Sequence, residues 1–280
     1  MYRIWALAAL ACLTVALAVP RGSANVSAAN PEDGKVISGK YTNKYFAMAY
    51  PLPSGWGEDR KGPAPSYSGY YVLTALKSGG GRTGTMLITA QDQFFVADLP
   101  SCAPEMVERF RRRISEIDGI TIDREPQEIS ISGARFTRLD FSGAGLYRTA
   151  LVAESRCHFV SLNLTTVGPG ERASLTQRLD RLSLGEPDNL ADEVPVCVKD
   201  YATPDHVISR VEPTPAAPKF TLVPVRVIIG VDGLVRHIHV IRASADQRAN
   251  ITAALGGWQF RPFFIEGRPV EVETGITFRF

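Results

Sequence analysis

The last eleven residues of the chain alternate between apolar and polar side chains. Successive side chains of a strand point to opposite faces, so this pattern predicts an antiparallel strand with one buried and one solvated face. The apolar face would carry Val270, Val272, Ile276, Phe278 and Phe280, and the polar face Glu271, Glu273, Thr277 and Arg279. Such a strand can also present an edge of main-chain groups to another strand.

Two apolar runs between Val223 and Ile241 flank Asp232-Gly233. This pair is a strong hairpin signal, because glycine accepts a positive φ. A two-residue loop would produce one apolar face, made of Val225, Val227, Ile229, Val231, Leu234, Ile238 and Val240. The alternative, a three-residue loop with a bulge, would turn His237 and His239 toward that face.

A helix is predicted directly after this hairpin. Ser244 and Gln247 have the spacing of a capping box, and Gly256-Gly257 is a typical helix end. Helical spacing buries Ile251, Ala254 and Leu255. An extended segment from Trp258, a turn at Glu266-Gly267 and the alternating last strand complete this region.

The first half of the chain has a different pattern. A helix that starts at a Ser101 cap buries Met106, Val107, Phe110, Ile114 and Ile117, and leaves its arginines outside. A second helix is marked by Leu175, Leu179 and Leu182. The predicted strands are an aromatic strand at 45–50, then 70–76, 85–90, 120–131, 135–141, 146–153 and 158–165. This order predicts an α+β fold, an antiparallel sheet with flanking helices.

The first 24 residues have the pattern of a signal peptide. An apolar run from Ile4 to Val19 is followed by Pro20 and the small residues Gly22-Ser23-Ala24, after which we place cleavage. This predicts a periplasmic or secreted protein with no transmembrane span once the signal is removed. Retention of the segment as an anchor is the alternative. The further divisions are a lead-in at 25–40, a first domain at 41–184, a linker at 185–193 and a second domain at 194–280.

Charge and cysteine content narrow the classes of function. The net charge is +2, from 31 basic and 29 acidic residues, so the chain lacks the basic excess of a nucleic-acid binder. Export permits disulfides, and Cys102, Cys157 and Cys197 remain after cleavage. We prefer a Cys102–Cys157 bond, because both residues fall in the first domain. Their spacing fits no zinc or haem motif.

Two segments resemble known families. YTNKYFAMAYPLPSGW, an aromatic strand that enters a Pro-Gly-Trp turn, resembles the PsbP-like fold, whose members are mostly non-enzymatic binding or assembly factors. The second domain resembles the TonB C-terminal domain over roughly its last 60 to 80 residues, the size of one small domain. The matching residues are Val227, Val231-Asp232-Gly233-Leu234-Val235, Ala253-Ala254-Leu255, Trp258-Gln-Phe260-Arg-Pro262 and Gly267-Arg-Pro269-Val270.

The TonB resemblance implies a small sheet with a helix packed on one face. It also implies that a partner, for example an outer-membrane receptor, binds as an added strand beside the last strand. The expected contact residues are Val270, Glu271, Val272, Glu273, Thr274, Gly275 and Ile276. The sequence lacks the family's long spacer and its Tyr-Pro pair, for which Ala202-Thr-Pro204 is the nearest substitute. We therefore expect partner binding in the envelope, with a link to outer-membrane transport, rather than energy transduction.

Catalytic motifs are weak, and no cofactor is expected. Gly79, Gly81 and Gly84 have dinucleotide-binding spacing, but a strand follows them where that motif needs a helix. His237 and His239 share one strand face and are candidate metal ligands that lack a third ligand. We therefore expect a binding protein that is not an enzyme. The alternatives are an envelope assembly factor and a metal-dependent hydrolase built on these two histidines.

Overall fold

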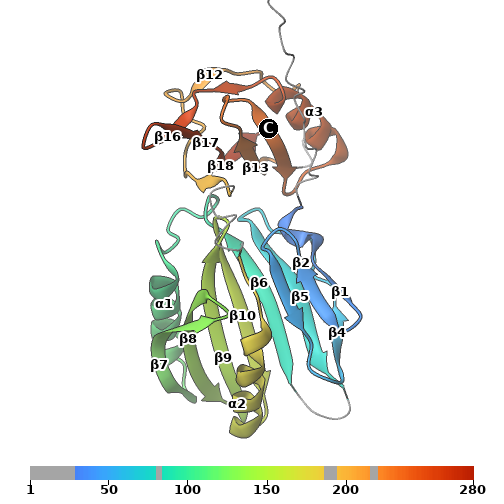
Figure 1. The fold of residues 1–280 in the computed structure, drawn as a ribbon, viewed down its shortest axis with the longest axis vertical. Coiled ribbons are helices and arrows are strands. Elements are labelled where there is room, and N and C mark those ends of the chain that lie inside the picture. The colour runs from blue at the N-terminus through green and yellow to red at the C-terminus, as the bar shows by residue number, and fades with distance from the viewer. Residues whose placement is uncertain (1–28, 80–83, 186–193, 215–219) are drawn as a thin grey trace, which may run out of the picture.

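The computed structural model describes residues 29–79, 84–185, 194–214 and 220–280. It shows a mixed α+β fold with mostly antiparallel sheets and few helices, arranged as two domains stacked end to end (Figure 1). The predicted signal peptide, and residues 186–193 of the predicted linker, lie outside the described residues. Among the residues described, no helix combines the length and the apolar character needed to cross a bilayer.

The first domain is built on a seven-stranded antiparallel sheet. A three-stranded sheet lies against it (Figure 1), with β1 (Lys35–Ile37), β2 (Lys40–Asn43) and β3 (Met48–Pro51) following a short 3₁₀ turn, η1 (Pro31–Asp33). From edge to edge the seven strands are β4 (Trp56–Arg60), β5 (Tyr70–Ser78), β6 (Thr85–Asp92), β10 (His158–Thr166), β9 (Leu146–Ser155), β8 (Ala134–Gly143) and β7 (Ile120–Ile131).

The two faces of this sheet are covered by different elements. Helix α1 (Ala103–Ser115) covers one face, and the small sheet, α2 (Pro169–Gln177) and η2 (Arg178–Arg181) cover the other. Successive side chains of β9 point to opposite faces of the sheet. Ala150 and Val152 pack with α1, whereas Leu151 and Ala153 belong to the core on the opposite side. Both faces of β9, in the interior of the sheet, are therefore buried.

Most predicted elements of this domain are confirmed, with three corrections. Ile117 lies beyond the end of α1 and is 55% exposed, so its predicted burial was wrong. Helix α1 begins after Cys102 rather than Ser101, because the Ser101 amide and hydroxyl both bond the carboxylate of Glu105, at 2.8 and 3.0 Å. The predicted aromatic strand starts late. Its first residues form a turn in which Ala47 has a φ of +43°, so β3 begins at Met48.

The second domain contains a four-stranded sheet in the order β11 (Val196–Cys197), β18 (Val272–Arg279), β13 (Leu222–Ile229) and β14 (Val235–Val240). Helix α3 (Ala245–Leu255) packs on one face through Ile251 and Leu255. Two short strand pairs lie outside this sheet. They are β12 (Val207–Ser209) with β15 (Gln259–Phe260), and β16 (Phe263–Ile265) with β17 (Arg268–Val270).

The β13–β14 hairpin has a longer loop than our preferred prediction. The amide of Gly230 bonds the carbonyl of Leu234 at 2.8 Å, and the register shifts beside Ile229. Val231 and Leu234 are each 45% exposed, so assigning them to the apolar face was wrong. The remaining residues of that face do pack together, and the Ser244–Gln247 capping box is present.

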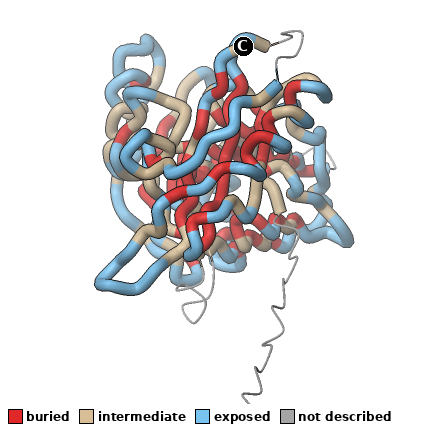
Figure 2. Tube along the Cα trace, turned by 90° about the horizontal axis from the view of Figure 1, so that it is seen from above, coloured by how far each residue is buried: buried red, intermediate tan, exposed pale blue. Residues whose placement is uncertain are grey.

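The polar face of the last strand was expected to be solvated, and that prediction was wrong for the first half of β18, whereas Thr277 and Arg279 are exposed as expected. Glu273 is only 2% exposed, because the first domain lies against this face. Figure 2, seen from above, shows the buried stretches gathered in the middle of the molecule and the exposed residues around them. The first half of β18 is therefore covered on both faces, and its second half is open on one face.

Candidate functional site

The outer edge of β18 was the predicted partner site, and its first half is already occupied. The strand β11 pairs with it in parallel. The amide of Val196 donates to the carbonyl of Glu271 at 2.8 Å, and the amide of Val198 donates to that of Glu273 at 3.1 Å. The expected free edge at Val270–Ile276 is therefore wrong over its first half. Of the predicted residues, only Thr274, Gly275 and Ile276 lie beyond these bonds, and the Thr274 hydroxyl accepts from the Tyr201 amide at 3.3 Å.

The second half of β18 keeps main-chain groups on its outer side. Main-chain groups alternate between the two sides of a strand. The Phe280 amide bonds Thr221 on the β13 side, whereas the Glu271 and Glu273 carbonyls face β11. By this alternation the amides and carbonyls of Gly275, Thr277 and Arg279 face outward. No main-chain partner for them is found within the described part of the chain.

A groove of about 370 Å³ lies beside this outward half. The indole of Trp258 is held at its wall, since its N–H donates to the carbonyl of Val211 at 2.8 Å. The guanidinium of Arg210 covers the same ring at 5.0 Å. The groove is lined by Asp200, Ala202, Thr203, Arg210, Glu212, Pro213, Trp258 and residues 275–279. It joins an open strand edge to a mixed polar and apolar wall, an arrangement suited to an extended peptide.

The two domains meet around Arg226, a residue of β13 that is 1% exposed. Its guanidinium forms ion pairs with Asp92, at the end of β6, and with Glu273, at 2.8 Å in the second case. It also donates to the Tyr45 hydroxyl at 2.9 Å. Burial raises the pKa of Asp92, and the charge of Arg226 opposes that rise.

Aromatic rings complete the Arg226 cluster. Tyr45 donates its hydroxyl to Glu273 at 3.0 Å, and its ring contacts the guanidinium groups of Arg156, at 4.6 Å, and of Arg226, at 5.9 Å. Burial raises the pKa of Tyr45 well above its ordinary range, so the phenol stays a donor. Two arginines and two carboxylates meet in this contact, which balances its charge. The sequence offered one signal that we missed, a lone arginine inside the apolar strand VPVRVII.

A disulfide joins the same two surfaces. Cys157, in the turn between β9 and β10, bonds Cys197 of β11, with a Cα–Cα distance of 5.5 Å. The predicted Cys102–Cys157 pair is therefore wrong, and Cys102 is a free thiol. The predicted pair assumed that disulfides stay within a domain. The end-to-end contact instead brings β11 next to the β9–β10 turn.

The two candidate metal ligands, His237 and His239, lie on the face of β14 that is turned toward the first domain. His239 is buried, bonds Glu32 at 2.9 Å and stacks on Tyr71. Burial, followed by the charge of His239, lowers the pKa of His237. His158 belongs to the Arg226 cluster and His206 stacks on Tyr201, so neither supplies the third ligand. Within the described ranges no group of three potential ligands forms.

His158 should make stability fall in mild acid. Burial and then the charge of Arg226 hold the pKa of His158 well below its ordinary value, so the folded chain keeps the ring neutral. The unfolded chain binds a proton below about pH 6.5. The contribution of His158 to the free energy of unfolding is therefore fully present above about pH 6.5. Below that pH it declines by up to about 1.4 kcal/mol per pH unit.

Urea denaturation at pH 7.5 and 5.5 tests this expectation. Because the His158→Asn substitution also changes absolute stability, the quantity compared is the pH-dependent change in unfolding free energy. That change should be smaller in the variant, because the proton that the unfolded chain binds at His158 no longer contributes to it. Equal changes in the two proteins would contradict the assignment.

Comparisons with known proteins find structural likenesses but no sequence relatives. No protein-family model and no curated protein matches this chain. Among solved structures it is similar to the PsbP protein of the cyanobacterium Synechocystis sp. PCC 6803 (CyanoP), with 13% identity and a TM-score of 0.38. The match covers 52% of this chain and 91% of that chain. At this low similarity, no binding site and no activity of that protein can be assigned to this chain.

Proposed function

We propose that this chain is an exported, non-enzymatic binding protein of the cell envelope. Its second domain binds an extended peptide segment of a partner protein as an added strand. The observation that carries the proposal is the outward-facing half of β18, where Gly275, Thr277 and Arg279 border the groove. The order of hairpin, helix and last strand, which resembles the TonB C-terminal domain, extends the proposal to partners in outer-membrane transport.

The position of β11 supports the same mode of binding. This strand lies in parallel beside the first half of β18, so the edge accepts a neighbour of that orientation. A partner segment would continue the line of β11 along the second half. Each main-chain bond would contribute about 0.5–1.5 kcal/mol. Because the edge is short, side chains in the groove must supply the rest of the affinity and the choice of partner.

Proline at Thr277 should abolish binding with little effect on the sheet. The Thr277 amide faces the groove, so proline removes a donor for the partner and no bond to β13. A photo-crosslinking residue at position 279 should trap the partner in cell envelopes. The adduct should disappear in Thr277→Pro and persist in Thr277→Ala, which keeps the amide. An unchanged adduct in a folded Thr277→Pro protein would refute strand addition at this edge.

A second candidate is an envelope assembly factor that takes no peptide ligand. The occupied first half of β18 and the buried contact between the domains favour it, because both suit a rigid scaffold. This candidate predicts that one large partner co-purifies with the chain and that Thr277→Pro leaves co-purification unchanged. The hydrolase alternative has no such support, since His239 is already bonded to Glu32.

A further inference from the structure

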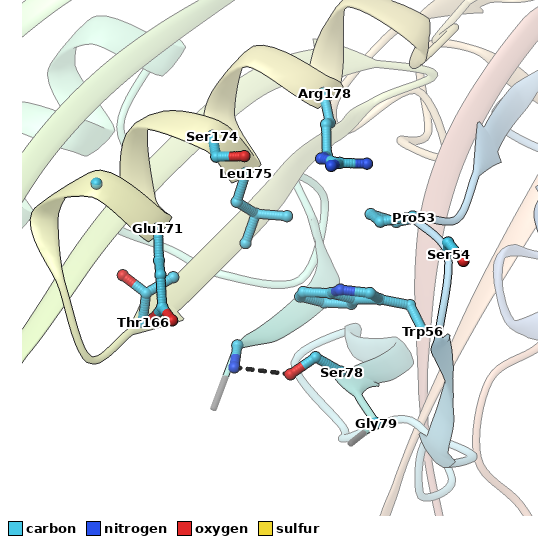
Figure 3. A pocket seen from close by; sticks show the side chains of 12 residues that line it. Pro53, Ser54, Trp56, Ser78, Gly79, Thr166, Glu171, Ser174, Leu175 and Arg178 are labelled. Carbon is cyan, nitrogen blue, oxygen red and sulfur yellow. Dashed lines mark hydrogen bonds between the residues drawn. The ribbon is translucent and has the colours of Figure 1, made fainter. Parts of the chain in front are cut away.

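A second cavity lies on the first domain, away from β18. It has a volume of about 530 Å³ and lies between α2 and the segment that leads into β4 (Figure 3). Trp56 faces the side chains of the helix across the opening. The Gly84 amide donates to the Ser78 hydroxyl at 2.9 Å and fixes part of the cavity wall. A cavity of this size suits a small molecule or a very short peptide.

The cavity has opposite charges at its two ends. Glu171, in the first turn of α2, and Arg178, where η2 begins, both line it. Their separation of seven residues is two helical turns, which places their Cα atoms on one face about 10 Å apart along the helix axis. Figure 3 shows Leu175 between them and the Trp56 ring opposite. Neither charged side chain forms an ion pair with another described residue.

We propose that this cavity binds a free peptide of about three residues with both termini charged. The α-amino group would meet Glu171, the α-carboxylate would meet Arg178, and an apolar central side chain would pack between Leu175 and Trp56. An extended tripeptide spans about 10 Å, which is comparable with the rise between these two positions along the helix. A guanidinium is well suited to a carboxylate, because it can donate two parallel bonds.

The test uses the tripeptide Ala-Phe-Ala and the full chain. Isothermal titration calorimetry should detect saturable binding, and Trp56 fluorescence should change with it. Acetylating the amino terminus, or amidating the carboxyl terminus, should each weaken binding roughly two- to fivefold, as expected for partly exposed ion pairs. These changes leave the protein unaltered, so folding does not affect the comparison.

Two charge-removing variants assign each terminus to its residue. Arg178→Gln should bind the free acid and the amide equally, and Glu171→Gln should bind the free amine and the acetylated peptide equally. Arg181→Gln is the matched control, since this exposed arginine of η2 does not line the cavity, and it should keep both preferences. Absence of saturable binding, or equal binding of all the peptides by the unaltered chain, would overturn the proposal. Thr277→Pro should not affect this binding, which separates it from strand addition.

Discussion

Replacing Arg226 by alanine should lower the free energy of unfolding by about 3–5 kcal/mol. The change removes the cation shared by two buried carboxylates, Asp92 and Glu273, and leaves the Tyr45 hydroxyl without a donor. Uncompensated buried charge is among the largest penalties that a single substitution can produce. Urea denaturation followed by circular dichroism gives the free energy directly.

The matched control is Arg236→Ala. Arg236 forms an ion pair with Asp232 at 2.5 Å, but both side chains are about half exposed. Exposed pairs contribute only about 0–1 kcal/mol, so this variant should remain close to the unaltered chain. Should Arg226→Ala cost no more than Arg236→Ala, the cluster between the domains would not be the stabilising contact described above.

Removing the disulfide should cost about 3–4 kcal/mol. The bond closes a loop with a sequence separation of 40 residues, and the chain-entropy model gives about that value for such a loop. The Cys157→Ser, Cys197→Ser double variant avoids an unpaired thiol at either position. Because β11 would lose its covalent tie to the first domain, the amides of Val196 and Val198 should also exchange hydrogen faster.

Cys102→Ser provides the comparison for the disulfide. The Cys102 thiol is free and its side chain makes no capping bond to α1, so serine should change stability by less than about 1 kcal/mol. A double variant as stable as Cys102→Ser would show that the disulfide does not hold the two domains. Unchanged exchange at Val196 and Val198 would show that β11 stays on β18 without it.

Local pattern was sufficient for most individual elements. The predicted strand at 120–131 matches β7, and the capping box placed the start of α3 correctly. These features depend on neighbouring residues, through side-chain alternation and through a cap that bonds its own helix. The loop of the β13–β14 hairpin was predicted less well, because Asp232-Gly233 fits more than one loop length.

Contacts between distant segments were not predictable in the same way. Arg226, Asp92 and Glu273 are far apart in the sequence and meet only because one end of the first domain covers the second sheet. The polar alternation of the last strand correctly indicated two faces, but a pattern in one strand does not say what lies against it. Arg226 is a charged residue in a strand whose side chains are otherwise apolar on both faces. Such a residue is the kind of signal that would have indicated a covered face.

The candidate site was predicted only in part for the same reason. The last strand was identified correctly, but the sequence did not reveal that β11 would occupy half of its edge. That pairing is short, and it follows residues 186–193, so local periodicity carries little information about it. The disulfide then ties β11 to the first domain, which is a constraint that cysteine spacing alone does not define.

The cysteine pairing also bears on how the chain matures. A polypeptide that is oxidised as it emerges, amino terminus first, exposes Cys102 and Cys157 before Cys197. The two earlier thiols can therefore react with each other before the native partner is present, and a thiolate must later reopen that bond. Maturation of this chain would then depend on an isomerase, or on early folding of α1 that keeps Cys102 away from Cys157.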